Sequence, residues 1–140
     1  MKQVAITVGI GMDIINCRRF DRLLSLKGSS FASRLSKRLL HPIHELPRFE
    51  SIATNSQRVQ FISGSWAAKE AVFKTLDSES QKLFSFKEWY KSNDKRGKPF
   101  ISSDKYDSED EQFLLTITHD ADFVAATVLR QRIIDLTSSL

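Results

Sequence analysis

The sequence predicts an α+β fold in which a mainly antiparallel sheet packs against one long helix. Two observations support this fold class. A helical pattern without proline runs from about residue 55 to residue 76, which is long enough to cross a small domain. Several strand patterns then follow in the second half, joined by short turns, which is typical of antiparallel pairing. The 140 residues contain no internal repeat and suit a single domain, residues 1–140.

The first half of the chain is expected to form a strand and two helices before the long helix. Apolar residues alternate with smaller ones over residues 4–10, which predicts a strand with one buried face. This strand should end in a glycine turn at residues 9–13. Asn16 can cap a first helix, and a second, basic helix is expected around residues 31–39. Two prolines then predict an irregular link over residues 42–55.

The second half is expected to form two hairpins, because aromatic and β-branched residues alternate there between turn residues. The expected elements are a strand at residues 83–90, a turn at 93–97, a strand at 99–102, and strands at 113–118 and 123–129 around a tight turn at 119–121.

Charge and composition restrict the function classes. The net charge is +4, and residues 18–38 hold many arginines and lysines against one acid, which predicts an anionic partner. The acidic run at residues 104–111 is expected to be a solvated loop. A single cysteine, Cys17, excludes an internal disulfide and favours a reducing compartment. No apolar run approaches the ~20 residues of a membrane span, and no signal peptide is expected.

Two short segments carry most of the chemical information. In residues 66–74, Glu70 and Lys74 lie one helical turn apart on the same face. Asp13 follows two glycines at the expected strand end. Two carboxylates and an ammonium together could hold a divalent cation and a phosphate. Spacing alone leaves simpler alternatives open: Asp13 as a helix cap, and Glu70 with Lys74 as an exposed ion pair.

Taken together, these segments resemble the signature of the phosphopantetheinyl transferases of the holo-acyl-carrier-protein synthase type. The resemblance continues in residues 84–86, 97–99 and 116–119, and it runs in order from about Val8 to about Leu129. It implies the 4′-phosphopantetheinyl transferase fold. It also implies Mg²⁺-dependent transfer of 4′-phosphopantetheine from coenzyme A to a serine of an apo-acyl carrier protein, releasing adenosine 3′,5′-bisphosphate, in fatty acid biosynthesis.

The resemblance assigns roles to the charged residues of both segments. Asp13 and Glu70 would be the metal ligands. Glu70 or a metal-bound water would take the proton of the serine, and Lys74 would contact the phosphates. Lys69 points about 100° away from Glu70 around the helix, so either a phosphate contact or a plain surface position is open for it.

Further residues are expected to bind the two substrates. Without the resemblance, His119 would count as a surface residue and residues 97–99 as an ordinary hairpin turn. The predicted coenzyme A-binding residues are Arg58, Lys74, Gly97, Lys98, Pro99, Thr118 and His119. Docking of the acidic acyl carrier protein is expected on the first helix, at Arg18, Arg19 and Arg22, which lie within about one turn of each other.

The resemblance also implies a homotrimer whose active sites lie between subunits, with no nucleic-acid or membrane partner. Ser65 stands where bacterial members often carry Arg. With the proline-bearing link, this departure favours a mitochondrial, fungal member over a cytoplasmic, bacterial one. His41 and His44 suggest a metal pair, but the sequence offers no further ligand. The alternatives in other classes are a small basic nucleic-acid-binding module and an inactive relative kept as an assembly subunit.

Overall fold

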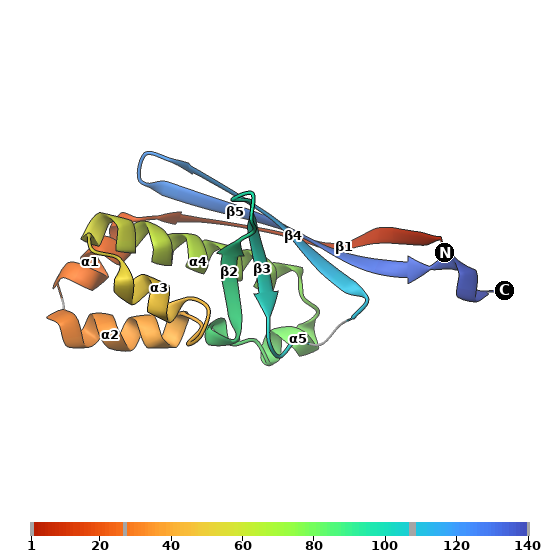
Figure 1. Ribbon diagram of the computed structural model, residues 1–140, viewed down its shortest axis with the longest axis horizontal. Coiled ribbons are helices and arrows are strands. Elements are labelled where there is room, and N and C mark those ends of the chain that lie inside the picture. Colours follow the sequence, from red (N-terminus) through yellow and green to blue (C-terminus); the bar gives the residue numbers. More distant parts are fainter. Residues whose placement is uncertain (1, 27, 107–108, 140) are drawn as a thin grey trace.

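The computed structural model describes residues 2–26, 28–106 and 109–139 and confirms the α+β prediction. A three-stranded antiparallel sheet has the order β1–β5–β4, formed by β1 (Gln3–Asn16), β5 (Phe123–Asp135) and β4 (Glu111–Asp120). A separate antiparallel hairpin consists of β2 (Trp89–Asn93) and β3 (Pro99–Ser103). Figure 1 shows the helices and this hairpin on one side of the long sheet.

The described part of the chain contains five α-helices, of which the fourth packs directly on the sheet. They are α1 (Arg18–Leu26), α2 (Gly28–Leu39), α3 (Leu46–Ser51), α4 (Asn55–Thr75) and α5 (Ser78–Lys82), with short 3₁₀ turns η1 (Phe86–Glu88) and η2 (Leu136–Ser139). None of the helices in the described part of the chain is both long and apolar enough to cross a membrane.

Helix α4 is the centre of the molecule, as the sequence predicts. The side chain of Thr54 accepts a hydrogen bond from Gln57 N (3.3 Å) and so caps the first turn. The helix packs against β1 and β5 on one side and against α1 and β2 on others (Figure 1). Its buried residues therefore lie all around its axis, including Ile62, Ala68 and Val72. This explains why its apolar residues form no single stripe.

Three predicted elements differ from the structure. Strand β1 does not turn at residues 9–13 but continues to Asn16, with only a bulge between Thr7 and Gly9. Residues 83–90 form η1 and only the start of β2, because tertiary packing of aromatic rings, rather than strand pairing, buries them. The link after α2 is not irregular: it contains α3, with Pro47 in its first turn, where proline is tolerated.

The prediction that the apolar residues of β1 form its buried face is also wrong. Val4, Ile6, Val8 and Ile10 are all exposed, and the residues that face α4 are instead Gly9, Gly11, Asp13 and Ile15. The outward-facing Ile10, Met12 and Ile14 are 67%, 58% and 64% exposed. The outer face of the sheet is thus apolar and uncovered within one chain.

The acidic run is only partly the solvated loop that the sequence predicts. Asp104 pairs with His41, and the side chain of Glu111 is 5% exposed in an ion pair with Arg130 (2.6 Å). Asp107 lies outside the described residues.

Candidate active site

Asp13, Glu70 and Lys74 meet where β1 crosses α4. The two elements can approach closely because Gly11 has no side chain: a Cβ there would lie 1.9 Å from the carbonyl oxygen of Ala71. Lys74 Nζ lies 3.2 Å from Asp13 Oδ1 and donates a hydrogen bond to the carbonyl of Met12 (2.8 Å). The strand carboxylate and the helix ammonium, 61 residues apart in sequence, are therefore direct partners.

Glu70 lies close enough to Asp13 for the two carboxylates to influence each other. Partial burial raises the pKa of Glu70, and the negative charge of Asp13 raises it further. Lys74 and Arg19 act in the opposite direction. Two hard oxygen ligands that repel each other fit a divalent cation such as Mg²⁺, which prefers one or two carboxylates at such a site. The donor set is thus suited to the predicted metal.

Arg19, which is predicted to dock the carrier protein, also lies near Asp13, Glu70 and Lys74. Its guanidinium lies over the ring of Trp66, 5.6 Å from the centroid, and its charge lowers the pKa of Glu70. Trp66 in turn stacks on Phe86 (4.7 Å between centroids). The other two predicted docking residues differ from Arg19: Arg18 pairs with Asp122 (2.9 Å), and Arg22 is exposed.

Both alternatives for Lys69 are wrong, because its side chain is completely buried. It donates hydrogen bonds to a carboxylate oxygen of Glu45, which is also 0% exposed, and to the carbonyl of Leu39 (2.7 Å). Burial lowers the pKa of Lys69, and the charge of Glu45 opposes that shift. Glu45 carried no prediction from the sequence. The signal in the sequence was Lys69 among the alanines of the long helix, a charge that needs a partner if that part of the helix is buried.

His119 and Thr118 lie at the opposite edge of the sheet from Asp13. His119 pairs with Val124 of β5, whose other neighbour is Ile15 of β1, so two strand spacings of about 5 Å separate the edges. Helix α4 packs over the strands between them. Within one chain, the structure therefore does not bring His119 together with Glu70.

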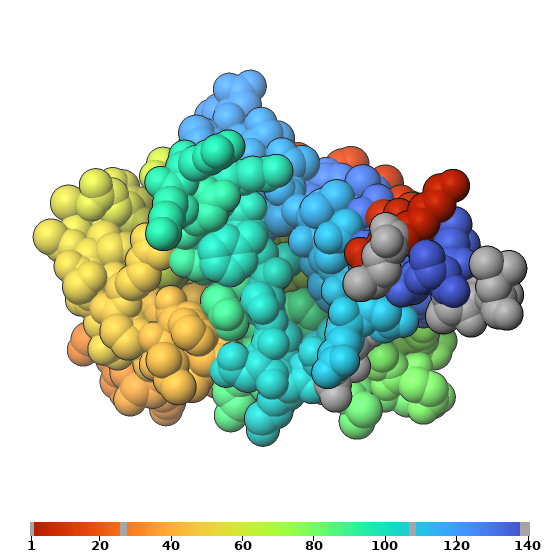
Figure 2. All heavy atoms as spheres, turned by 45° about the vertical axis from the view of Figure 1, so that its right-hand side comes forward, coloured from red at the N-terminus to blue at the C-terminus, as the bar shows by residue number. Residues whose placement is uncertain are grey.

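The β2–β3 turn lies on the same side of the molecule as His119. Figure 2 shows the hairpin against β4, in agreement with the packing of β3 on that strand. Gly97 has φ +83°, which favours glycine, and its N–H donates to the carbonyl of Asp94 (3.0 Å). The Asp94 side chain accepts from the N–H of Lys98 (3.0 Å). The hairpin thus presents Lys98, which is exposed, at an ordered turn.

Arg58 is engaged in holding α3. Its guanidinium donates to the carbonyls of Ile52 (2.8 Å) and Glu50 (3.3 Å) and lies over the ring of Phe49. It is 12 residues before Glu70 on α4, which corresponds to about 18 Å along the helix axis. The structure does not place Arg58 beside the carboxylate pair of its own chain.

A second group of potential metal ligands is not suited to a metal. His41, His44 and Asp104 place one ligand atom each within 4.8 Å of one another. However, His41 Nδ1 accepts hydrogen bonds from the N–H groups of Ile43 (3.1 Å) and His44 (3.2 Å). A neutral imidazole then carries its proton on Nε2, which contacts Asp104. Binding a metal through Nε2 would require the loss of that proton or of both backbone contacts.

A cavity of about 510 Å³ lies between α1, α2 and the start of α4, lined by residues that include Leu24, Ser33 and Phe49. Asp13, Glu70 and Lys74 do not line it. The candidate site is instead partly exposed where β1 and α4 meet, since the side chain of Lys74 is 47% exposed and that of Asp13 17%.

Comparison with known proteins identifies the family of this site. The sequence model of the 4′-phosphopantetheinyl transferase superfamily matches residues 9–128, which include Asp13, Glu70, Lys74 and His119. The chain belongs to this superfamily. A holo-[acyl-carrier-protein] synthase of Bacillus pumilus is 34% identical over 125 residues, covering 89% of this chain and 96% of the relative.

Solved structures agree with this membership of the transferase superfamily. A holo-(acyl-carrier-protein) synthase from Bacillus anthracis, in complex with CoA (3′,5′-ADP), is similar at a TM-score of 0.70 and 28% identity, covering 90% of this chain and 97% of that one. Holo-ACP-synthase from Plasmodium yoelii has a TM-score of 0.71 at 24% identity, with coverage of 92% and 98%, and this likeness concerns the fold.

Proposed function

We propose that this chain is a holo-acyl-carrier-protein synthase, which transfers 4′-phosphopantetheine from coenzyme A to a serine of an apo-acyl carrier protein and releases adenosine 3′,5′-bisphosphate. The observation that carries the proposal is the ion pair of Asp13 with Lys74, with Glu70 near enough to feel both charges, in a chain of the phosphopantetheinyl transferase superfamily. The Bacillus pumilus relative bears this name, and the Bacillus anthracis relative was solved with CoA (3′,5′-ADP).

The chain's own residues account for the main needs of the reaction. Either Glu70, which lies near Asp13 and Lys74, or a metal-bound water would accept the serine proton. Lys74 would exchange its contacts with Asp13 and the Met12 carbonyl for the departing phosphate, since an exposed ammonium on a flexible stem can do so. Mg²⁺ held by Asp13 and Glu70 would supply charge neutralisation at the pyrophosphate. Positioning and electrostatics dominate phosphoryl transfer of this kind.

The proposed assembly is a homotrimer in which each site is shared between two subunits. Two observations support a second copy as the occupant of the uncovered sheet face. Asp13 on β1 and His119 on β4 lie on opposite edge strands of the sheet, so the two groups of predicted site residues do not meet within one chain. The outer face also exposes Ile10, Met12 and Ile14, an apolar surface suited to a homo-oligomer interface.

The apolar surface available for a trimer interface lies on β1, whereas the faces of α4 are largely covered within the chain. In this assembly Gly97, Lys98, Pro99, Thr118 and His119 would reach coenzyme A held by the carboxylates of a neighbouring subunit. Arg58 would have to leave the carbonyls at the end of α3 to contribute.

The proposed carrier-docking surface is α1, which begins five residues after Asp13 and bears Arg18, Arg19 and Arg22. Its arginines suit an acidic acyl carrier protein. The predicted mitochondrial location stays a prediction, and the sequence relative quoted above is bacterial.

Mass spectrometry of an apo-acyl carrier protein tests the proposed function. After incubation with this protein, coenzyme A and MgCl₂, the carrier should gain the mass of phosphopantetheine, and adenosine 3′,5′-bisphosphate should appear in equal amount. Omission of coenzyme A, and replacement of the acceptor serine by alanine, are the controls. An unmodified carrier, tested with carriers from both bacterial and mitochondrial sources, would contradict the proposal. Binding to nonspecific DNA without any transfer would favour the nucleic-acid-binding alternative.

A further inference from the structure

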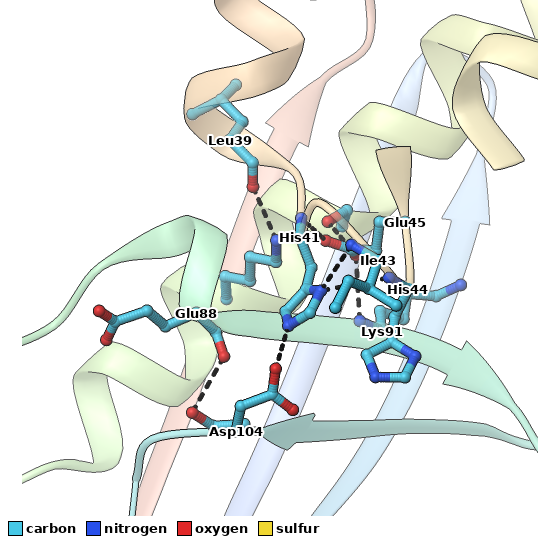
Figure 3. Close-up of polar contacts among 11 residues, drawn as sticks. Leu39, His41, Ile43, His44, Glu45, Glu88, Lys91 and Asp104 are labelled. Carbon is cyan, nitrogen blue, oxygen red and sulfur yellow. Dashed lines mark hydrogen bonds and ion pairs between the residues drawn. The ribbon is translucent and has the colours of Figure 1, made fainter. Parts of the chain in front are cut away.

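A fully buried polar cluster lies behind the candidate site, on the other side of α4. We call it the Glu45 cluster, and it is centred on the Glu45 carboxylate. One oxygen accepts hydrogen bonds from Lys69 Nζ and the N–H of His41 (2.9 Å), and the other accepts from Ser65 Oγ (2.6 Å) and the N–H of Lys91 (3.0 Å). Figure 3 shows Glu45 and His41 of the loop after α2 beside Lys91 of β2.

The loop that carries Glu45 is itself held firmly. His41 Nδ1 accepts from two backbone N–H groups of the loop, and its Nε2 contacts Asp104, just after β3 (Figure 3). The rings of His44 and Tyr90 stack at 4.0 Å. Lys69 also donates to the carbonyl of Leu39 at the end of α2. The Glu45 carboxylate is therefore held in place by its loop, and Ser65 and Lys69 of α4 donate hydrogen bonds to it.

The position of these contacts around the helix axis is informative. At 100° per residue, Ser65 and Lys69 lie only about 40° apart, whereas Ala71 lies about 200° from Lys69. Ala71 is the residue whose carbonyl oxygen packs against Gly11. The helix is thus held on one side by β1 and on nearly the opposite side by the Glu45 cluster, and Glu70 and Lys74 project between these two contacts toward Asp13.

Stability alone does not explain a buried ion pair at this position. The cost of removing two charges from water often exceeds their attraction, and apolar residues of similar size are frequently as stable or more so. Directional hydrogen bonds differ from apolar contacts because they define one rotation of the helix, whereas alanine-rich packing tolerates small rotations. An error of about 1 Å in the position of a catalytic group can lower a rate by two orders of magnitude.

We infer that Glu45 and Lys69 are positioning residues for the transfer reaction: together they fix the rotation of α4 that directs Glu70 and Lys74 toward Asp13. This inference rests on the proposed function and extends it to a pair that contacts neither substrate. The pair stabilises the geometry of the reacting groups more than it stabilises the fold.

The decisive variant replaces both partners at once, because a single replacement would leave a buried charge without its partner. Glu45→Met with Lys69→Met keeps the volume and removes both charges. We expect the variant to fold but to melt at a lower temperature, because the N–H groups of His41 and Lys91 and the hydroxyl of Ser65 lose their acceptor. Its dissociation constant for coenzyme A should stay within about twofold of the wild-type value. We expect kcat for transfer to fall about 10- to 100-fold with little change in KM for coenzyme A.

Each protein sample is titrated with coenzyme A before the assay to measure the fraction of chains that can bind it. The rate of transfer is then expressed per coenzyme A-binding site. A merely structural role would reduce that fraction and the melting temperature while leaving kcat per site unchanged. A matched control is Glu79→Gln with Lys82→Met, which removes an exposed ion pair (3.2 Å) on α5 and should leave kcat and KM unchanged.

A milder variant is used if the double variant does not fold. Ser65→Ala removes one hydrogen bond to Glu45 and leaves the ion pair intact. We then expect a decrease in kcat of about two- to fivefold. Wild-type kcat per site in whichever of these variants folds would overturn the positioning role. The wild-type protein is assayed in parallel: its failure to modify any carrier would contradict the proposed function, whereas an active wild type with equally active variants would contradict only the positioning inference.

Discussion

Gly11 and Ala71 lie so close together that a single methyl group would not fit between them. A Cβ on Gly11 would lie 1.9 Å from the Ala71 carbonyl oxygen, which belongs to the helix backbone and cannot rotate away. Strand β1 and helix α4 therefore lie closer together than they could if position 11 held any residue other than glycine. This contact brings the strand carboxylate of Asp13 within reach of Glu70 and Lys74.

The first prediction follows from this contact. Gly11→Ala should push β1 away from α4 and lower the free energy of unfolding by about 3 kcal/mol or more, because overpacking against backbone is hard to relieve. Urea unfolding followed by circular dichroism measures the loss. Gly64→Ala on α4 is the matched control, since a Cβ there would meet only Lys91 Cε at 4.0 Å. It should be neutral or stabilising by up to about 1 kcal/mol.

The second prediction concerns the carboxylates of the candidate site. Asp13→Asn and Glu70→Gln should each reduce Mg²⁺-dependent transfer by at least about 100-fold without loss of fold, because each removes one charge from a two-carboxylate site. Turnover and melting temperature should be measured on the same samples. Addition of EDTA should abolish wild-type transfer, and excess MgCl₂ should restore it. Near-normal turnover in either variant would contradict the assignment of both residues as metal ligands.

The third prediction concerns the uncovered sheet face. Met12→Asp should place a charge in the proposed interface between subunits and convert the trimer to monomers. Sedimentation equilibrium should give about 48 kDa for the wild type, three times the 16.0 kDa chain, and about 16 kDa for the variant. Leu83→Asp is the control, because Leu83 is also apolar and exposed but lies outside the sheet. A wild type that is a fully active monomer would contradict both the trimer and the shared site.

The fourth prediction concerns His119, which the shared site places beside coenzyme A. His119→Ala should weaken coenzyme A binding about tenfold and leave KM for the carrier nearly unchanged, since loss of one contact to a charged phosphate typically costs 1.5–3 kcal/mol or less. Calorimetry with coenzyme A measures the change. Unchanged affinity would return His119 to its alternative as a plain surface residue.

The fifth prediction concerns acid stability. Hydrogen bonds from Arg130, with a further one from Tyr106, lower the pKa of Glu111 from its usual 4.5 to about 2. A carboxyl group with a lowered folded-state pKa stabilises the fold above about pH 4.5 and loses that contribution as the pH falls toward 2. The contribution of Glu111 is on the order of 2–3 kcal/mol at neutral pH.

Urea unfolding of the wild type and of Glu111→Gln between pH 7 and pH 3 measures this dependence. The variant should be less stable at pH 7, and its stability should fall less steeply between pH 4.5 and pH 3. Glu79→Gln on the exposed α5 pair should instead follow the wild-type profile. Identical pH slopes for the wild type and Glu111→Gln would show that Arg130 does not hold this carboxylate ionised in acid.

The sequence alone determined the fold class, the long helix and the family, because these depend on local patterns. The helix at residues 55–75, the hydrogen bond that Asn16 accepts at the start of α1 and the last two strands follow from spacing and residue type. The predicted turn at residues 119–121 is displaced, because His119 and Asp120 still pair within β4 and the turn begins at Ala121. Asp13, Glu70 and Lys74 could be predicted as a group because they lie in short segments with recognisable neighbours.

Only the tertiary structure decided which surfaces are buried and which charges are paired. Alternating residues in β1 indicate two faces but cannot show which of them receives α4, and here the glycine face does because it alone allows close approach. The pairing of Lys69 with Glu45 joins residues 24 positions apart, and that of Glu111 with Arg130 joins residues 19 apart. A residue's charge is local information, whereas its partner and its exposure to water depend on how distant segments pack.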